Sequence, residues 1–465
     1  MNNKKVEIFH GYNNNIVMSD LYKLSVNNIT KSLQFQKKIG VEKARVLILV
    51  DEVLDNKITS VISNFKPDIF LQLSKDDKID IDIKSSVVLV RGSNTHKILK
   101  QLKIKTHKTY IEIDLNAIEN NIKMFKSIIP DGCNIISVIK AESYGVGTKT
   151  LAHFLQMFGI EQFAVGCIDE GIELRNDKIN RPIMVMNPDF DNLVDCLDWN
   201  LEPTIYSKMS LNKLLQLKPE GKFPIHLKVQ TGMNRFGFNI DELDWIVDKL
   251  KDSNFFVKSI YSHLVDTDNY DYTVYQISNF NEHYKKLLKE LGYKPHRHIL
   301  NTEGIINYPQ WSFEYVRLGL GIWGNLKESQ HKSNSTTAVS WFSKIYQIRE
   351  IEKGESVGYG RYFTATKKTK IALIPVGYAD GFKRSLSNGV GQVYISNNKC
   401  PVIGRVCMDL IMVDITDKLI NEGDLVEIIG KNQTAEQLSD CIETIVDELF
   451  TGISQRVNRI FIWRF

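Results

Sequence analysis

The sequence has few cysteines and no long hydrophobic run, and each shortage argues against a class of protein. Its six cysteines form no CxxC pair and no metal-ligand spacing, so we expect buried, reduced thiols and no bound metal. No apolar run approaches the length of a membrane span, and the N-terminal stretch lacks the apolar core of a signal peptide. We therefore expect a cytoplasmic protein without a membrane partner.

Charge of one sign is not concentrated anywhere either. The 59 lysines and arginines nearly balance the 55 aspartates and glutamates, and the lysines are spread along the chain. The net charge of +4 is too small and too dispersed to indicate a nucleic-acid partner. A hydrophobic share of 43% is ordinary for a globular protein, and 465 residues are too many for one domain.

Three blocks of different character divide the chain, which we expect to be an α/β protein. We assign residues 1–105 to a small three-layer α/β domain, 106–335 to a (β/α)8 barrel and 336–465 to a mainly antiparallel β domain. The first block contains runs typical of strands or helices. The expected strands are Val46–Val53, Asp68–Leu73 and Val87–Arg91, and the expected helices are Met18–Ile39 and Lys57–Phe65.

The middle block carries the pattern of a (β/α)8 barrel. After a strand at Tyr110–Asp114 and a helix at Asn116–Ile129, eight short apolar runs are expected as strands, most of them followed by a helical stretch. They are Asn134–Lys140, Phe163–Cys167, Pro182–Met186, Glu202–Tyr206, Ile225–Gln230, Phe256–His263, His298–Asn301 and Phe313–Leu318. The chemistry of this fold takes place at the carboxyl ends of the strands, where several of these runs end in a polar residue.

The third block alternates in strand fashion between glycine-containing turns. Its expected strands are Val339–Arg349, Ile371–Gly377, Gln392–Ser396, Pro401–Ile403, Leu410–Asp414, Leu425–Ile429 and Arg459–Phe465. Short helices are expected at Thr434–Cys441 and Cys441–Leu449.

Lys140, at the end of the first barrel strand, is the strongest candidate for catalysis. Partial burial lowers the pKa of a lysine and makes it a nucleophile that can form an imine. Tyr144 follows at the start of the next expected helix, and Gly145 and Gly147 permit close backbone approach to an anion. The alternative is a surface lysine at a strand end, which the tyrosine and glycines that follow make less attractive.

Arg317 ends the eighth strand, beside loops that often bind phosphate in barrels. Those loops supply Asn301, Thr302, Gly319 and Leu320. The alternative is that Arg317 pairs with a carboxylate in the barrel and that Thr302 only caps a helix. Together with Lys140, this group suggests a Schiff-base site for a phosphate-bearing cofactor.

Further candidates lie at other strand ends and in the β domain. Arg235 can bind a carboxylate or phenolate through two hydrogen bonds, and His263 can orient a ring, although a lone strand-end histidine is more often structural. For Lys228, a salt bridge within the barrel is the alternative. In the β domain, glycine-flanked turns carry Tyr359, Tyr378 and the pair Met408 and Asp409, which we interpret as the rim of a site.

Through these residues and motifs, residues 108–465 resemble alanine racemase. That enzyme uses pyridoxal 5'-phosphate and has a (β/α)8 barrel followed by a β domain. The resemblance implies that Lys140 binds the cofactor and moves one α-proton of alanine, and that Tyr359 of a partner subunit is the base on the opposite face. It implies a homodimer and a role in supplying D-alanine for peptidoglycan. The resemblance further implies that Arg317 contacts the pyridine nitrogen, Arg235 the ring hydroxyl and His263 the ring, and that Lys228 is carbamylated to fix Arg235. The implied phosphate contacts are Tyr144, Asn301, Thr302, Gly319 and Leu320. The implied substrate contacts are Arg235, Tyr378, Met408 and Asp409.

The chain departs from the family pattern at several positions. Val146 and Glu142 stand where a histidine and a small polar residue are usual, and Gln230 replaces a common aspartate. Gln455 replaces a phosphate-binding tyrosine, which weakens one expected contact. The residues expected to transfer protons are all present.

The first 105 residues resemble, more distantly, the C-terminal domain of the Mur ligases, specifically UDP-N-acetylmuramoyl-tripeptide:D-alanyl-D-alanine ligase. Gly11–Asn15 with Ser19, and Val88–Ser93, carry that resemblance. No GxxxxGK[ST] phosphate loop occurs in the chain, so we expect a packing or docking domain without ligase activity.

Three other interpretations stay open. A racemase for serine or another small amino acid would share the same residues and differ only in its pocket. A decarboxylase of similar architecture would need a glycine-rich phosphate stretch that we do not find. A non-catalytic scaffold would be indicated by loss of Lys140 or Tyr359, and both are present.

Overall fold

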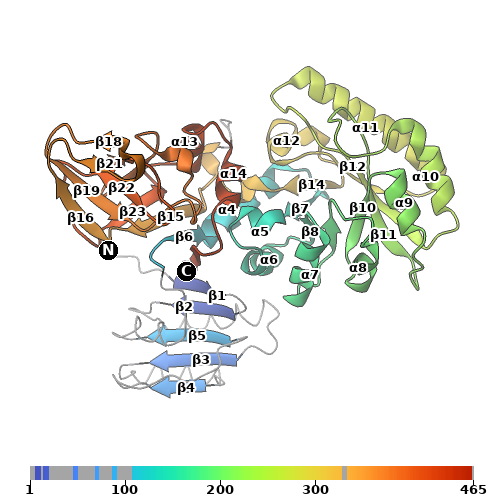
Figure 1. Ribbon diagram of the computed structural model, residues 1–465. Helices are drawn as coiled ribbons and strands as arrows, with labels where there is room; N and C mark the ends of the chain where they lie inside the picture. Colours follow the sequence, from blue (N-terminus) through green and yellow to red (C-terminus); the bar gives the residue numbers. More distant parts are fainter. Residues whose placement is uncertain are drawn as a thin grey trace. The chain divides into compact units, whose positions relative to one another are not determined.

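The computed structural model describes residues 6–11, 14–19, 45–50, 69–72, 86–91, 107–326 and 332–462 (Figure 1). The chain forms two compact units, one of residues 1–118 with 337–465 and one of residues 119–336. The boundary between them falls within α4 (Leu115–Ile128). No described helix is long and apolar enough to cross a membrane.

The unit of residues 119–336 is built on eight parallel strands, as the sequence predicted. They are β7 (Asn134–Val138), β8 (Gln162–Val165), β9 (Ile183–Val185), β10 (Glu202–Ile205), β11 (Phe223–Lys228), β12 (Phe255–Tyr261), β13 (His296–His298) and β14 (Tyr315–Leu318). Their order is β13-β12-β11-β10-β9-β8-β7-β14, so the last strand pairs with the first. Across the remaining seam, Arg317 N donates to Leu300 O at 3.0 Å.

Most of these strands end one to three residues earlier than the sequence predicted. Lys140, His263 and Asn301, predicted at the ends of strands, lie in the segments just beyond them. The backbone leaves the ladder of hydrogen bonds before it reaches these polar residues.

Helices and short 3-10 turns connect the strands. Figure 1 shows α7 to α11 on the outside of the parallel sheet. The elements are α5 (Lys140–Tyr144), α6 (Thr148–Met157), α7 (Ile168–Asn176), α8 (Leu193–Asp198), α9 (Lys208–Leu214), η1 (Ile240–Glu242), α10 (Leu243–Leu250), α11 (Tyr270–Leu291), α12 (Thr302–Asn307), η2 (Pro309–Trp311), η3 (Leu320–Trp323) and η4 (Lys332–Asn334).

Apolar periodicity explains how these helices attach. In α10 the buried residues Leu243, Ile246, Val247 and Leu250 recur every three or four positions and form one face. Inside the sheet, a cluster that includes Val138, Ala164 and Met184 fills the space below the carboxyl ends of the strands. The strand ends therefore rest on a packed core.

The other unit contains mainly antiparallel sheets, as predicted for the third block. An eight-stranded sheet has the order β2-β1-β24-β6-β15-β23-β20-β21, in which β1 is Val6–Gly11 and β2 is Asn14–Ser19. Smaller sheets have the orders β16-β19-β22 and β17-β18. Their strands are β6 (Tyr110–Asp114), β15 (Val339–Lys344), β16 (Gln347–Ile351), β17 (Ser356–Val357), β18 (Phe363–Thr364), β19 (Thr369–Ile374), β20 (Gln392–Ile395), β21 (Asn398–Pro401), β22 (Ile411–Asp414), β23 (Leu425–Ile429) and β24 (Asn458–Ile462). This unit also contains η5 (Tyr359–Arg361), η6 (Arg384–Leu386), α13 (Ala435–Asp440) and α14 (Val446–Thr451).

The prediction of one strand over Val339–Arg349 is wrong. The chain leaves β15 at Ile345, whose N–H donates to Asp424 O at 3.1 Å, and enters β16 after Tyr346, whose N–H donates to Leu373 O at 2.9 Å. Two residues thus transfer the backbone from one sheet to another, and the alternating pattern continues across that break.

In the N-terminal part, the three predicted strands are present as a parallel sheet of order β4-β3-β5. Their bounds are β3 (Arg45–Val50), β4 (Ile69–Gln72) and β5 (Ser86–Arg91). The hairpin of β1 (Val6–Gly11) and β2 (Asn14–Ser19), in which β1 also pairs with β24, was not predicted. Met18 and Ser19, expected in a helix, belong to β2. The rest of that helix and the one at Lys57–Phe65 lie outside the described residues.

Candidate active site

Lys140 begins the turn that follows the first barrel strand. The next four residues, Ala141 to Tyr144, have φ angles between 52° and 60°. L-residues adopt this left-handed conformation at a cost of about 1–2 kcal/mol each. Positive φ angles at Gly145 and Gly147 follow, and the right-handed helix α6 starts only at Thr148. The prediction that Tyr144 opens the following helix is therefore wrong.

Glu170, which the sequence analysis missed, holds this turn in place. Its Oε1 accepts from Ala141 N and its Oε2 accepts from Gly166 N, both at 2.6 Å. One carboxylate of α7 thus ties the loop after β7 to the loop after β8. Glu142 supports the far end of the turn, where its Oε2 accepts from Thr148 N at 3.3 Å. A glutamate in the first turn of a helix gives no signal of this role, since such residues are common there.

Hydroxyls and backbone N–H groups converge beyond β14, where the sequence predicted a phosphate site. Thr302 Oγ1 accepts from Gly319 N at 3.4 Å and from Gly321 N at 3.3 Å. A Cβ atom on Gly319 would collide with Tyr144 Oη, so the tyrosine hydroxyl reaches this loop from the other side. Leu320 begins η3 at the same point. The structure therefore brings Tyr144, Thr302, Gly319 and Leu320 together.

The capping alternative applies to Asn301 rather than to Thr302. Asn301 Oδ1 accepts from Gly304 N at 3.0 Å and so caps α12. The hydroxyl of Thr302 bonds instead to the two glycine N–H groups. Asn301 lies beside the group of Thr302 and Gly319 and shapes it by fixing the start of α12.

Arg317 is almost fully buried, at 2% exposure, and lies between two histidines. Its Nη1 donates to His298 Nδ1 at 2.8 Å, and its Nη2 donates to His263 Nδ1 at 3.1 Å. Burial, and then the charge of Arg317, hold the pKa of both imidazoles well below the usual range. Both rings are therefore neutral and accept through Nδ1. Among the described residues no carboxylate pairs with Arg317, so the alternative of a carboxylate partner finds no support.

Lys228 is buried at 4% exposure, with its Nζ 5.3 Å from the ring centre of Tyr261 and 5.8 Å from that of Phe236. No carboxylate pairs with it among the described residues, so the predicted alternative of a salt bridge finds no support. Burial, and then the nearby cations Arg317, Arg235 and Lys140, lower the pKa of Lys228 to about 7. A neutral, reactive amine is therefore available near neutral pH.

Arg235 lies exposed in the loop after β11. That loop is closed by the bridge between Val229 and Phe238. Gln230 organises it, because its Oε1 accepts from Gly232 N at 3.0 Å and from Asn234 N at 2.9 Å. The glutamine thus holds two backbone N–H groups of the loop in place.

Tyr359, Tyr378 and Met408 all lie on the β-rich unit, and all are exposed, at 74%, 44% and 54%. Tyr378 N donates to Cys407 O at 3.1 Å, which joins the turns that carry Tyr378 and Met408. A Cβ on Gly377 would collide with Met408 O, so only glycine allows this close approach. The two predicted rim residues are thus held side by side.

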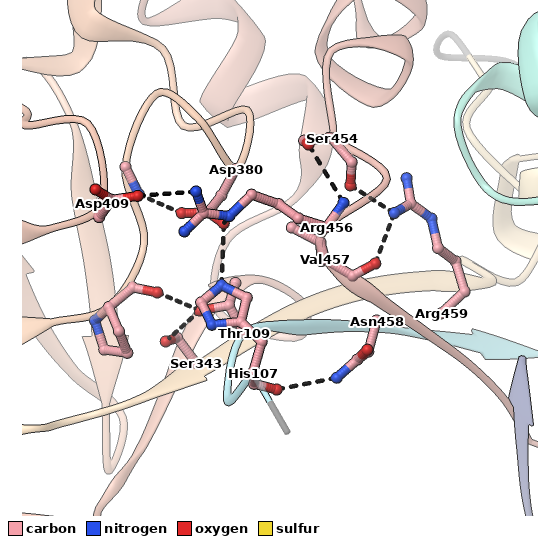
Figure 2. Close-up of polar contacts among 12 residues, drawn as sticks. His107, Thr109, Ser343, Asp380, Asp409, Ser454, Arg456, Val457, Asn458 and Arg459 are labelled. Carbon is pink, nitrogen blue, oxygen red and sulfur yellow. Dashed lines mark hydrogen bonds and ion pairs between the residues drawn. The ribbon is translucent and has the colours of Figure 1, made fainter. Parts of the chain in front are cut away.

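Asp409 is fixed by an arginine that the sequence analysis did not single out. Figure 2 shows Arg456 between two carboxylates, with Nη1 2.8 Å from Asp409 Oδ1 and Nε 2.9 Å from Asp380 Oδ1. Asp380 is fully buried and also bonds His107 Nε2 at 3.0 Å. The network anchors the turn that ends in Met408 and Asp409. Nothing in the spacing of Asp380 and Arg456 in the sequence signals this contact.

The barrel site can hold a carbonyl compound that carries a phosphate group. Lys140 offers an amine, the loop at Gly319 offers N–H groups and hydroxyls, and Arg317 offers a buried cation. In the part of the chain that the structure describes, no group of three or more histidines, cysteines or acidic residues is placed to hold a metal ion.

Comparison with known proteins places this chain among enzymes of one kind. Residues 113–327 match the family model "Alanine racemase, N-terminal domain", and residues 338–461 match "Alanine racemase, C-terminal domain". An alanine racemase of Halothermothrix orenii is 34% identical over 369 residues, which cover 76% of this chain and 97% of that protein.

Solved structures agree. An alanine racemase from Clostridium difficile 630 superposes with a TM-score of 0.73 at 30% identity, covering 77% of this chain and 96% of that one. The alanine racemase of Bartonella henselae with covalently bound pyridoxal phosphate gives a TM-score of 0.70 at 28% identity, covering 76% and 99%.

Proposed function

Because the chain belongs to the alanine racemase family, we propose that Lys140 and Tyr359 are the two residues that move the α-proton of alanine. The family interconverts L-alanine and D-alanine with pyridoxal 5'-phosphate, and D-alanine is a building block of peptidoglycan. The observation that carries the proposal is the gathering of Lys140, Tyr144, Arg317 and the Gly319 loop at neighbouring strand ends of one barrel.

The barrel residues fit this cofactor. Gly319 leaves a cradle that a Cβ would fill, lined by Tyr144 Oη and Thr302 Oγ1, which suits a phosphate. Lys140 would hold the cofactor's carbonyl carbon, Arg317 its ring nitrogen and Arg235 its ring hydroxyl. His263, neutral and bonded to Arg317, would contact the ring. When bound, the cofactor supplies an electron sink that makes the α-proton of alanine acidic enough to leave.

Two bases are needed because racemisation removes the proton from one face and returns it to the other. Lys140 Nζ would hold the proton on one face and Tyr359 Oη on the opposite face, each contributing ~10²–10⁴ in rate. Arg317 keeps its own protons, because a buried guanidinium gives them up far less readily than a pyridinium. A ring nitrogen that faces Arg317 would therefore stay unprotonated and be a weaker electron sink, which would favour return of the proton to the substrate over side reactions.

We propose a homodimer in which each site takes Tyr359, Tyr378, Met408 and Asp409 from the partner. The exposure of Tyr359, Tyr378 and Met408 supports this arrangement, since large side chains that remain exposed on one unit commonly mark an interface. Arg235, Tyr378, Met408 and Asp409 would then border the alanine.

Lys228 is proposed to be carbamylated. Its lowered pKa supports this, because a neutral amine can attack carbon dioxide, forming an N–C bond and releasing a proton to solvent. The resulting anion would pair with the nearby guanidinium of Arg235 and hold it in place.

Three assignments complete the proposal. Residues 1–105 would form a domain that resembles the end of a Mur ligase and serves packing or docking, and its parallel sheet β4-β3-β5 supports an α/β unit there. Residues 106–335 and 336–465 would be the barrel and the β domain. The enzyme would act in the cytoplasm on free alanine.

The test is turnover of the purified chain with pyridoxal 5'-phosphate and L-alanine, followed by chiral analysis of the product. The Tyr359→Phe variant should bind the cofactor with unchanged absorbance and form D-alanine about 10²-fold more slowly. Loss of cofactor absorbance in that variant would show that Tyr359 is structural. L-serine in the same assay distinguishes an alanine racemase from a racemase of broader range.

A further inference from the structure

A row of buried polar side chains runs around the barrel interior from Arg317, one from each of five neighbouring strands. Arg317 Nη1 lies 2.8 Å from His298 Nδ1, and His298 Nε2 lies 2.9 Å from Ser259 Oγ. Ser259 Oγ lies 2.6 Å from His226 Nδ1, and His226 Nε2 lies 2.9 Å from Glu202 Oε2. We call these five residues the polar row. None is more than 7% exposed.

The hydrogen bonds of the polar row can run in only one direction. A guanidinium only donates, so His298 Nδ1 accepts, and His298 must carry its proton on Nε2. That N–H donates to Ser259 Oγ, which leaves the serine hydroxyl proton for His226 Nδ1. His226 then carries its own proton on Nε2 and donates it to the carboxylate of Glu202. Every donor points from Arg317 toward Glu202.

The protonation states of the residues in the polar row agree with this direction of the hydrogen bonds. Burial lowers the pKa of His226 and His298, so both rings are neutral. Burial raises the pKa of Glu202, but its hydrogen bonds to His226 and Lys258 and the charge of Lys258 outweigh that effect and hold the pKa below its usual range. Lys258 Nζ lies 2.7 Å from Glu202 Oε1 and 2.8 Å from Oε2. The row therefore has a cation at one end and an anion at the other.

We propose that Ser259, His226 and Glu202 are positioning residues for Arg317, acting through a one-way hydrogen-bond row that fixes His298 as the Nε2–H tautomer. This inference rests on the proposed contact of Arg317 with the cofactor ring. The row keeps Nδ1 of His298 unprotonated, so this nitrogen accepts from Arg317 and carries no N–H that would oppose the guanidinium. Polarised by the distant carboxylate, His298 is also a better acceptor than an isolated imidazole. Arg317 is thereby held in one orientation as a cation.

Two variants test the row, each with a matched control. Ser259→Ala removes the central hydroxyl, and Thr204→Val removes another buried barrel hydroxyl, one that bonds Tyr261 Oη at 3.3 Å outside the row. Glu202→Gln removes the terminal charge, and Glu314→Gln removes a carboxylate that pairs with Arg297 instead. The first readout is ¹⁵N NMR of histidine-labelled protein without cofactor, with signals assigned by single histidine variants. The second is kcat, KM and the visible spectrum of the holoenzyme.

In the wild type we expect His226 and His298 both as neutral Nε2–H tautomers. Ser259→Ala and Glu202→Gln should shift the nitrogen signals of both rings and lower kcat about 10-fold, with a smaller change in KM, while the controls change neither. A His298 that carries its proton on Nδ1, or on both nitrogens, would overturn the inference. So would a kcat in both row variants within about twofold of wild type.

Failure of the proposed function looks different. If Arg317 does not face the cofactor ring, Arg317→Gln leaves the visible spectrum of the holoenzyme unchanged, even though the wild-type tautomers are as expected. If a row variant does not fold, the tautomers of His226 and His298 in the wild-type NMR spectra still test the inference.

Discussion

Four basic side chains lie close enough in the barrel to influence one another, and this shapes the chemistry of single residues. Lys228 experiences the charges of Arg317, Arg235 and Lys140 in addition to its own burial. The pKa of His263 is lowered by burial and by the same group of cations. The site therefore repels further protons and suits anions, which agrees with a phosphate and a carboxylate as its natural contents.

Lys228→Met should stabilise the protein at and below neutral pH in buffer free of carbon dioxide. The lysine has a pKa of about 7 in the folded chain against 10.5 when it is fully exposed, as in the unfolded chain, so the unfolded chain binds the proton more tightly. The buried charge therefore lowers the free energy of unfolding in full below pH 7, and this effect fades as the pH rises from about 7 to 10.5. Urea unfolding at several pH values should show the variant more stable by a few kcal/mol at pH 6, with convergence near pH 10. A stability difference between variant and wild type that stays constant across that pH range would contradict the lowered pKa of Lys228.

Lys140→Ala should abolish the visible absorbance of the protein-bound cofactor and reduce racemisation to background. Alanine has no amine to bind the cofactor's carbonyl carbon and none to move a proton. Absorbance spectra before and after dialysis, together with chiral product analysis, measure both effects. Lys149→Ala, on the right-handed helix α6 that follows, is the matched control and should behave like wild type. A retained cofactor band in the first variant would contradict the role of Lys140.

At the scale of elements, the functional geometry resides in short loops that break regular structure. The left-handed turn from Ala141 to Tyr144 aims the tyrosine hydroxyl at the loop of Gly319. Glu170 offsets part of the strain in that turn with two short hydrogen bonds. Sequence patterns predicted the strands well, because apolar runs of strand length report burial directly. They could not predict this turn, because alanine, glutamate, serine and tyrosine all favour other conformations.

Gly319→Ala should weaken cofactor binding by about 10-fold or more while the protein remains folded. A methyl group there would collide with Tyr144 Oη and displace the hydroxyl from the cradle. Titration of the protein without cofactor, followed by absorbance, gives the affinity, and thermal unfolding without cofactor reports the fold. Gly292→Ala is a control glycine outside the site. An unchanged affinity in Gly319→Ala would mean that the phosphate binds elsewhere.

At the scale of the whole molecule, the predicted residues separate into two sets carried by different units. Lys140, Tyr144, Arg317 and the Gly319 loop belong to the barrel unit, whereas Tyr359, Tyr378 and Met408 belong to the β-rich unit. Motifs in the sequence identified both sets. Contacts between residues far apart in the chain, such as Arg456 with Asp380 and Asp409, were not predictable, because no local pattern encodes a partner tens of residues away.

A composite site predicts that two inactive variants restore one another. Mixed dimers of Lys140→Ala and Tyr359→Phe chains would contain one site with both wild-type residues and one with neither. After the subunits exchange freely, about a quarter of all sites should be intact. Activity measured after mixing, unfolding and refolding together checks this, and each variant refolded alone is the control. Mixtures no more active than the separate variants would contradict a site shared between subunits.

The most direct test of two-base racemisation is the fate of the α-proton in deuterated water. L-alanine is incubated with the purified protein and pyridoxal 5'-phosphate, and both deuterium content and chirality are followed from the earliest times. The account predicts D-alanine that carries deuterium at its α-carbon from the first turnover, because the base that returns the proton differs from the one that removed it. Exchange into L-alanine without any D-alanine would contradict a working base on the opposite face, and D-alanine that retains the original proton would contradict the two-base mechanism itself.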